Sequence, residues 1–233
     1  MSRFDFVEFE TLMERIRSDW TQGQHVVLIG PTGCGKTTVL NRLLDARQYV
    51  LFFGTKLYDD SYERLLRSGY RRYSRYRDVP TWVNRAMLWP RIPRGTDLRD
   101  IYRIQVDAFR PALNAIFHER GWTVVLDELH YICHQLRLEP EAAMFHHQGR
   151  SSNLTMVDGF QRPAHVPLVV YGSASHVFVW KTKQVDTDGR RLADFGGADK
   201  RELSTNLMGL ERFEFIYIDP VNLTPPVRSK MRL

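Results

Sequence analysis

The chain has 233 residues, of which 43% are hydrophobic and 26% are charged, and its formal net charge is +6. This size and composition predict a globular protein that buries a substantial core in one α/β domain. No apolar run approaches the ~20 residues of a membrane span, which argues against an integral membrane protein. The positive charge, carried by arginine far more than lysine, favours polyanionic partners.

The first elements can be predicted from periodicity. Apolar residues at helical spacing predict a helix over 6–20, and the apolar run 25–29 predicts a strand. The first residues lack the charged-then-apolar layout of a signal peptide, and Cys34 and Cys133 do not suggest a disulfide. We therefore expect a cytoplasmic protein with no membrane association.

The stretch Gly30-x-x-x-x-Gly35-Lys36-Thr37 matches the phosphate-binding loop in full, with a strand before it and a helix predicted over 37–46 after it. Glycines let successive N–H groups converge on phosphate oxygens, and the helix N-terminus favours the same anion. Lys36 is expected to reach the β- and γ-phosphates of ATP, and Thr37 to ligate Mg²⁺. The predicted ATP-binding residues are Gly30, Pro31, Thr32, Gly33, Cys34, Gly35, Lys36, Thr37 and Thr38.

A strand is predicted over 49–53, followed by a short helix that ends at Arg67 and is capped by one of the residues 59–61. Residues 68–95, here called the arginine-rich segment, interleave arginines with tyrosines and tryptophans and contain one acid, Asp78. Several prolines argue against one regular element, so we interpret it as an insertion on the nucleotide-binding core. Its arginines are predicted to contact a DNA backbone, with a solvated basic surface or a subunit-packing surface as alternatives. The candidates are Arg71, Arg72, Arg75 and Arg77.

A long helix is predicted from residue 96 or 97 to about residue 120, kinked or split at Pro111. The strand 121–126 then runs into Asp127 and Glu128. An unbroken apolar strand ending in two carboxylates is typical of a central parallel strand beside a phosphate-binding loop. Asp127 is placed to hold Mg²⁺ and Glu128 to activate the water that attacks the γ-phosphate; the alternative for Glu128 is a helix cap.

Helical residues 129–149, broken at Pro140, precede a strand predicted over 153–157. Strands over 176–180 and 213–218, with helices between 186 and 210, are predicted to complete one domain over 1–219, and residues 166–173 fit either strand or helix. The remaining basic tail, 220–233, is predicted to be mobile.

Two polar residues flank the strand predicted over 153–157. Gln161 follows it and is placed to sense the γ-phosphate or the attacking water, unless it is an ordinary loop residue. Arg150 precedes it and could project into a neighbouring subunit's site, or could be solvated. A zinc site is a weaker interpretation of the nearby histidines and cysteine, because no four-ligand spacing is completed. These residues are His130, Cys133, His134, His146 and His147.

The phosphate-binding loop, the strand ending at Glu128, and the block from His146 through Gln161-Arg162-Pro163 to Trp180 together resemble the HerA/FtsK superfamily of DNA-pumping ATPases. The resemblance is closest to compact phage and mobile-element members, including viral genome-packaging ATPases. It implies a RecA-like P-loop core, a hexameric ring and movement of double-stranded DNA, and it makes a viral portal or capsid component a candidate partner. It further implies that Gln161 is the sensor and Arg150 the arginine finger. One departure from the family pattern is that we expect no separate DNA-orienting domain in this chain.

Other nucleotide-binding classes fit less well. The Asn-Lys-x-Asp guanine reader of GTPases and the Leu-Ser-Gly-Gly signature of ABC ATPases are both absent from the sequence. A small-molecule or nucleotide kinase with an arginine-rich lid is an alternative, but it has no need of a water-activating glutamate. A phage assembly ATPase that does not act on DNA is a third possibility.

Overall fold

The computed structural model describes residues 4–196 and 198–231 and confirms the predicted α/β class. Within these residues, one sheet of nine strands has the order β3-β4-β2-β5-β6-β1-β7-β8-β9. The strands from β3 to β7 in that order are parallel, and β8 and β9 add an antiparallel edge. The bounds are β1 His25–Ile29, β2 Val50–Phe53, β3 Arg71–Tyr73, β4 Arg85–Leu88, β5 Thr123–Leu126, β6 Thr155–Phe160, β7 Ala174–Trp180, β8 Glu214–Asp219 and β9 Thr224–Lys230.

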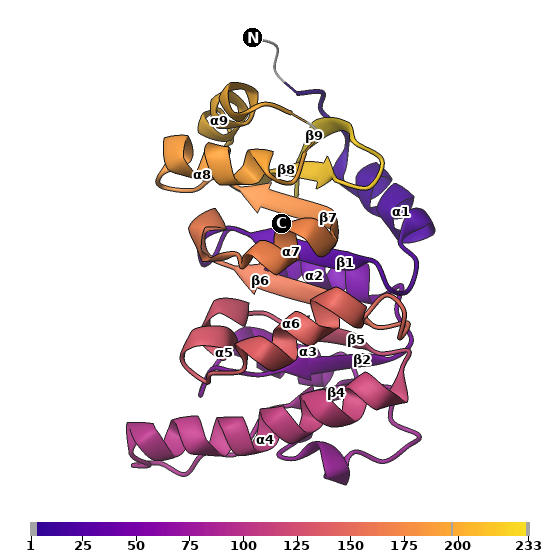
Figure 1. The fold of residues 1–233 in the computed structure, drawn as a ribbon, viewed down its shortest axis with the longest axis vertical. Helices are drawn as coiled ribbons and strands as arrows, with labels where there is room; N and C mark the ends of the chain where they lie inside the picture. The colour runs from indigo at the N-terminus through magenta and orange to yellow at the C-terminus, as the bar shows by residue number, and fades with distance from the viewer. Residues whose placement is uncertain (1–3, 197, 232–233) are drawn as a thin grey trace.

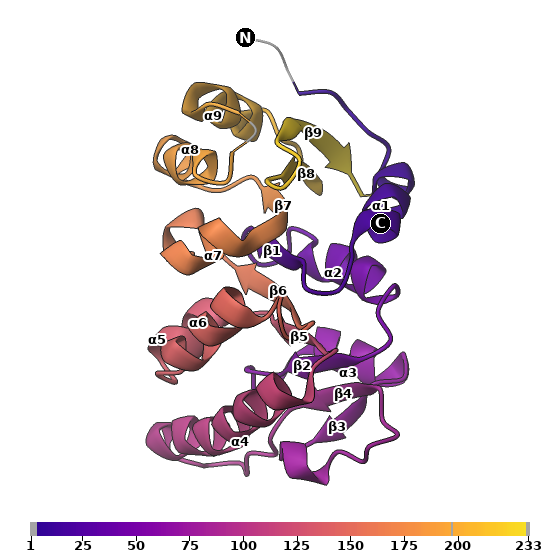
Figure 2. The same cartoon turned by 45° about the vertical axis from the view of Figure 1, so that its right-hand side comes forward.

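Helices cover both faces of the sheet, with α1 to α3 on one side and α4 to α9 on the other (Figures 1 and 2). Alternate residues of a strand point to opposite faces, so Val26 packs with the first group and Val27 with the second. The helices are α1 Phe9–Asp19, α2 Lys36–Leu44, α3 Asp60–Arg67, α4 Leu98–Glu119, α5 Leu129–His134, α6 Glu139–Gln148, α7 Leu168–Ser173, α8 Val185–Ala193 and α9 Lys200–Met208, with 3-10 turns η1 Tyr76–Asp78 and η2 Pro163–His165.

Several boundaries differ from the predicted ones for identifiable reasons. Pro111 lies inside one continuous helix, α4, and Pro140 lies in the first turn of α6, where its missing N–H is tolerated. Residues 168–173, left open between strand and helix, form α7. The strand predicted over 153–157 is β6, and it ends at Phe160, so Gln161 directly follows it.

The arginine-rich segment contains more regular structure than predicted. Its strands β3 and β4 join the main sheet, with β4 pairing in parallel with β2. Three consecutive residues of β4, Ala86 to Leu88, are fully buried, which accounts for its place inside the sheet. The segment therefore extends the nucleotide-binding core at its edge.

The prediction of a mobile tail is wrong for residues 224–230, because β9 pairs with β8. Arg228 of β9 is buried, and its guanidinium lies 2.6 Å from the Glu214 carboxylate. Two prolines are compatible with β9 because it lies at the sheet edge. Residues 232–233 of the predicted tail lie outside the described residues. Within the described residues, no helix has the length and apolar character needed to cross a bilayer.

Candidate active site

The phosphate-binding loop connects the fully buried strand β1 to the N-terminus of α2. Gly33 and Gly35 have φ angles of 78° and 111°, a region that favours glycine, so the loop curls as the motif predicts. A Cβ on Gly30 would lie 2.8 Å from the Cβ of Trp180 on β7. The core therefore holds the loop closely against the strands on which it rests.

The Lys36 ammonium is held across the opening of this loop. It donates hydrogen bonds to the carbonyls of Gly30 at 2.5 Å and Pro31 at 3.0 Å. Thr37 and Thr38 follow in the first turn of α2 and are partly exposed. The loop thus presents a cation, two hydroxyls and a helix N-terminus at one place, which suits a polyphosphate.

Asp127, Glu128 and Gln161 lie at the carboxyl ends of the parallel strands, as the phosphate-binding loop does. Asp127 and Glu128 follow β5, and Gln161 follows the adjacent strand β6. The Gly30 N–H donates to the carbonyl of Phe160 at 2.9 Å, which ties the loop to the residue before Gln161. The structure therefore brings the predicted loop, carboxylates and sensor together.

The position of Asp127 depends on a glycine that lies outside the two nucleotide-binding motifs. A Cβ on Gly159 of β6 would lie 2.1 Å from the Asp127 carbonyl oxygen, so a larger residue would displace the backbone that carries Asp127. Its signal in the sequence is a glycine inside a strand, which often marks a close backbone approach.

The pKa values of the two carboxylates are raised by different combinations of groups. Burial raises the pKa of Asp127, and the charges of Lys56 and Lys36 oppose that rise. Burial and the neighbouring Asp127 raise the pKa of Glu128, while Gln161 donates to both Glu128 oxygens at 3.4 Å and lowers it. Glu128 is thus a stronger proton acceptor than an exposed glutamate, and Gln161 holds its carboxylate directly.

Sequence reasoning missed Lys56, which follows β2 beside β5. Its ammonium lies 2.7 Å from the Asp59 carboxylate, and its charge acts on both Asp127 and Glu128. The adjacent Thr55 carbonyl accepts from Gln105 at 2.6 Å, which anchors the backbone here to α4. No short motif signals this lysine, because its role depends on β2 and β5 being neighbours in the sheet.

Arg150 lies at the opposite end of the strands, where their amino ends meet. Arg150 packs against Gly23: a Cβ placed on Gly23 would lie 3.3–3.4 Å from the backbone and Cγ of Arg150. Gly23 precedes β1, whereas the phosphate-binding loop follows β1. Arg150 is exposed, so its guanidinium is presented to the outside rather than to the ATP site of its own chain.

A buried network supports the turn that carries Arg150. The Met156 N–H donates to Nδ1 of His25 at 3.1 Å, so this nitrogen carries no proton. Burial, then His146 and Arg150, lowers the pKa of His25 to about 3, which keeps the ring neutral. His146 in turn lies 3.1 Å from the buried Asp158 carboxylate. These contacts fix the start of β6 and the turn before it.

The four predicted DNA-contact arginines are not equivalent. Arg72 donates to the Trp89 carbonyl at 2.8 Å and the Pro90 carbonyl at 3.2 Å and lies over the Trp89 ring, so it braces the sheet edge. Arg71 lies over the exposed Trp82 ring, 4.5 Å from its centroid. Arg75 and Arg77 line a pocket beside α4.

The residues considered for zinc do not form one cluster. His130 stacks on His165, with ring centroids 4.2 Å apart, and also contacts His134, whereas His146 belongs to the network near Arg150. Among the described residues, no group of three or more histidine, cysteine, aspartate or glutamate side chains has a metal-binding arrangement.

This fold and site define a P-loop ATPase. Residues 18–175 match the AAA domain family, and the chain belongs to that family. A search of curated proteins gives no match.

Solved structures with the same fold include viral and bacterial ATPases. The genome packaging NTPase B204 from Sulfolobus turreted icosahedral virus 2 has a TM-score of 0.64 at 15% identity, over 92% of this chain and 99% of that one. The pCW3 conjugation coupling protein TcpA has a TM-score of 0.50 at 15% identity, over 89% of this chain and 59% of that one. The Type VII secretion ATPase EccC of Thermomonospora curvata has a TM-score of 0.55 at 15% identity, over 90% and 25%. The predicted resemblance to viral packaging ATPases is confirmed in the fold.

Proposed function

We propose that this protein is a ring-forming motor that couples ATP hydrolysis to movement of double-stranded DNA, as in viral genome packaging or transfer of a mobile element. The proposal is supported by the positions of the candidate residues at the two ends of the parallel strands. Lys36, Glu128 and Gln161 lie at the carboxyl ends of the strands, and the exposed Arg150 lies at the amino ends. The fold shared with a genome packaging NTPase over nearly the whole of both chains supports the same function.

The hydrolytic step follows from the residues at the carboxyl edge. The loop N–H groups and Lys36 bind the phosphates, and Glu128 accepts a proton from the attacking water. Gln161, in contact with Glu128, orients that water and senses the γ-phosphate. The Thr37 hydroxyl and the Asp127 carboxylate fit Mg²⁺, a cation that prefers oxygen ligands. When bound, Mg²⁺ supplies positive charge to the phosphate oxygens.

Arg150 is proposed to act on the ATP of a neighbouring copy. Because it precedes β6 while Gln161 follows β6, it reaches a catalytic edge only when a second chain stacks head-to-tail on the first. Repetition of one head-to-tail contact closes a ring when the rotation between neighbouring subunits adds up to a full turn, and the superfamily resemblance favours six subunits. Arg150 then stabilises charge on the transferred phosphoryl group. We place the ring in the cytoplasm or on the virion, docked on a portal or capsid component.

Duplex DNA is proposed to lie against the outer edge of the arginine-rich segment. Arg71 and Trp82 form an exposed cation–π pair there, and Arg91 and Arg94 are also exposed. Guanidinium groups that grip phosphates fix DNA without reading its sequence. Arg72 is excluded from this contact because carbonyls already hold it.

The DNA contact is tested by replacing Arg71, Arg91 and Arg94 together by alanine. We expect the slope of log affinity against log salt to become shallower by about 1 for each DNA phosphate that the variant no longer neutralises. DNA-stimulated ATPase activity should disappear while basal turnover remains. The matched control replaces three exposed arginines elsewhere, Arg15, Arg190 and Arg201. Equal salt slopes for wild type and the first triple variant would refute this DNA surface.

A further inference from the structure

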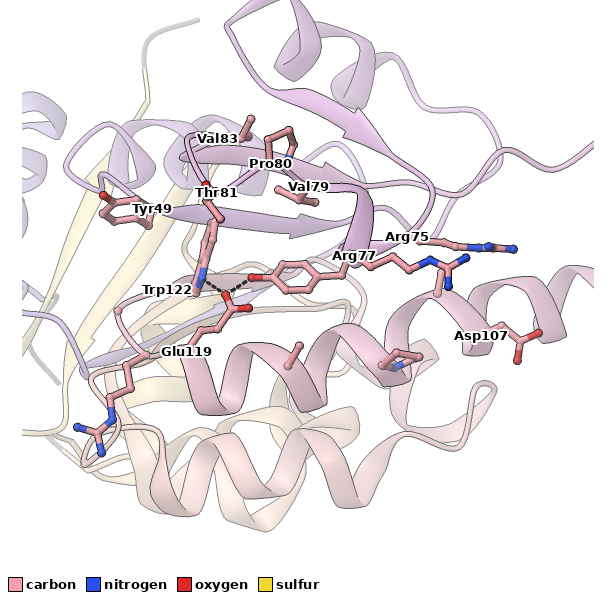
Figure 3. A pocket seen from close by; sticks show the side chains of 16 residues that line it. Tyr49, Arg75, Arg77, Val79, Pro80, Thr81, Val83, Asp107, Glu119 and Trp122 are labelled. Atoms are coloured by element: carbon pink, nitrogen blue, oxygen red, sulfur yellow. Dashed lines mark hydrogen bonds between the residues drawn. The ribbon is translucent and has the colours of Figure 1, made fainter.

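A cavity of about 870 Å³ lies between η1, the loop after it and the C-terminal half of α4 (Figure 3). Its wall is mainly apolar, with side chains of Val79, Pro80, Val83, Ala108 and Pro111. This volume is in the range of pockets that enclose a small molecule or a few side chains of a bound protein segment. Neither the ATP site nor the proposed DNA edge uses this pocket.

Hydrogen bonds fix one wall of the pocket. The Glu119 carboxylate accepts from the Trp122 indole at 3.2 Å and from the Tyr76 hydroxyl, and the Tyr49 and Trp122 rings meet edge-to-face at 5.7 Å (Figure 3). Glu119 is therefore already engaged. The Tyr76, Glu119 and Trp122 side chains that form this wall therefore hold one another in place.

The rim of the pocket is basic. Arg75, Arg77 and Arg120 line it, against Asp107 and the engaged Glu119. Arg77 has one weak exposed pair, with its Nε 3.9 Å from the Asp78 carboxylate. Figure 3 shows Arg75 and Arg77 projecting at one end of the pocket. An apolar pocket with this rim fits a segment with an aromatic side chain beside an acid.

The chain carries such a segment at the other end of its own strands, where their carboxyl ends meet. Leu57 and Tyr58 follow β2 and are 42% and 76% exposed, which is unusual for large apolar side chains. Asp60, two residues further, is exposed at the start of α3. We call residues 57–60 the docking loop.

We propose that the docking loop of one copy inserts Tyr58 into the pocket of the next copy and places Asp60 against Arg77. This inference rests on the head-to-tail ring of the proposed function and assigns the contact that builds it. The pocket and the docking loop flank the same strand, since Tyr49 precedes β2 and the docking loop follows it.

The same stacking serves both contacts. Arg150 precedes β6 and Gln161 follows it, just as the pocket precedes β2 and the docking loop follows it. The Trp122 carbonyl of the pocket accepts from the Thr155 N–H at 3.0 Å, and the Gly121 N–H donates to the Asn153 carbonyl at 3.1 Å, so the pocket and the Arg150 turn are one rigid edge. An arrangement that brings Arg150 to the next copy's Glu128 therefore also turns the pocket toward the side of that copy that carries the docking loop.

Sedimentation velocity with the ATP analogue AMPPCP over a range of protein concentrations tests this contact. Tyr58→Ala is expected to weaken assembly by about 30-fold, as truncation of a buried aromatic anchor does. Arg77→Glu and Asp60→Arg should each also prevent formation of the assembled species. The control Arg201→Glu, an equal charge change on α9, should assemble like wild type. Circular dichroism checks that each variant is folded.

Mixing the two charge variants is the decisive arm. In an equimolar mixture the two variants can alternate around a six-membered ring. Each contact between different variants then joins either a wild-type pair or a reversed pair of opposite charges, so assembly should return. Variants that assemble like wild type, or a mixture that does not recover, would overturn this interface while leaving the ring intact. A wild-type chain that stays monomeric at every concentration would overturn both the interface and the ring.

Discussion

Replacing Glu128 by glutamine is expected to lower the ATP turnover number by about a hundredfold or more while leaving ATP affinity close to wild type. Glutamine keeps the size of the side chain and its contact with Gln161, but it cannot accept the proton of the attacking water. The pKa of Glu128 is raised by burial and by Asp127, so the wild-type carboxylate is a stronger base than an exposed one. Phosphate release measures the turnover, and a fluorescent ATP analogue measures the binding.

Two further variants bracket this result. Lys36→Ala should remove most ATP binding, because the ammonium is the cation held across the phosphate-binding loop. Glu14→Gln, the same chemical change at an exposed position on α1, should leave both quantities unchanged. A Glu128→Gln protein that turns over ATP at nearly the wild-type rate would contradict the assignment of Glu128 as the base.

Arg150→Ala is expected to abolish most ATP hydrolysis by itself, and mixing it with Glu128→Gln should restore part of the activity. Where an Arg150→Ala chain supplies the ATP site and a Glu128→Gln chain supplies the arginine, the interface contains an intact Glu128 and an intact Arg150. In a random ring about a quarter of the interfaces have this arrangement. The expected loss in each single variant is large because an arginine finger acts on transition-state charge.

A mixture of Lys36→Ala with Glu128→Gln is the matched control. Both changes lie at the same sheet edge, so no interface of these two chains contains a complete site, and no activity should return. If the Arg150→Ala mixture shows co-assembly by sedimentation but no recovery, Arg150 is not the group supplied by the neighbouring subunit.

The parts of the site that could be predicted from the sequence depend on short contiguous patterns. Gly30 to Thr38 carry their own turn-forming glycines, and Asp127 and Glu128 follow an unbroken apolar strand. Gln161 could be predicted because it follows a strand, although that strand ends three residues later than expected. Each of these features is local, so one sequence is enough to find it.

The features that were missed depend on pairing between distant segments. Strand β9 contains two prolines and basic residues, as a mobile tail would, and only its pairing with β8 makes it a strand. Lys56 reaches the Asp127 region because β2 lies next to β5. Arg72 looks like its arginine neighbours in the sequence, and only the carbonyls of Trp89 and Pro90 distinguish it.

Movement of this protein along double-stranded DNA can be measured as displacement of a fluorescent third strand from the end of a DNA duplex. The wild-type protein is expected to release the third strand with ATP but not with AMPPCP, and Glu128→Gln should release none. ATP hydrolysis that proceeds fully on the same duplex without releasing the third strand would show that hydrolysis is not coupled to movement along DNA.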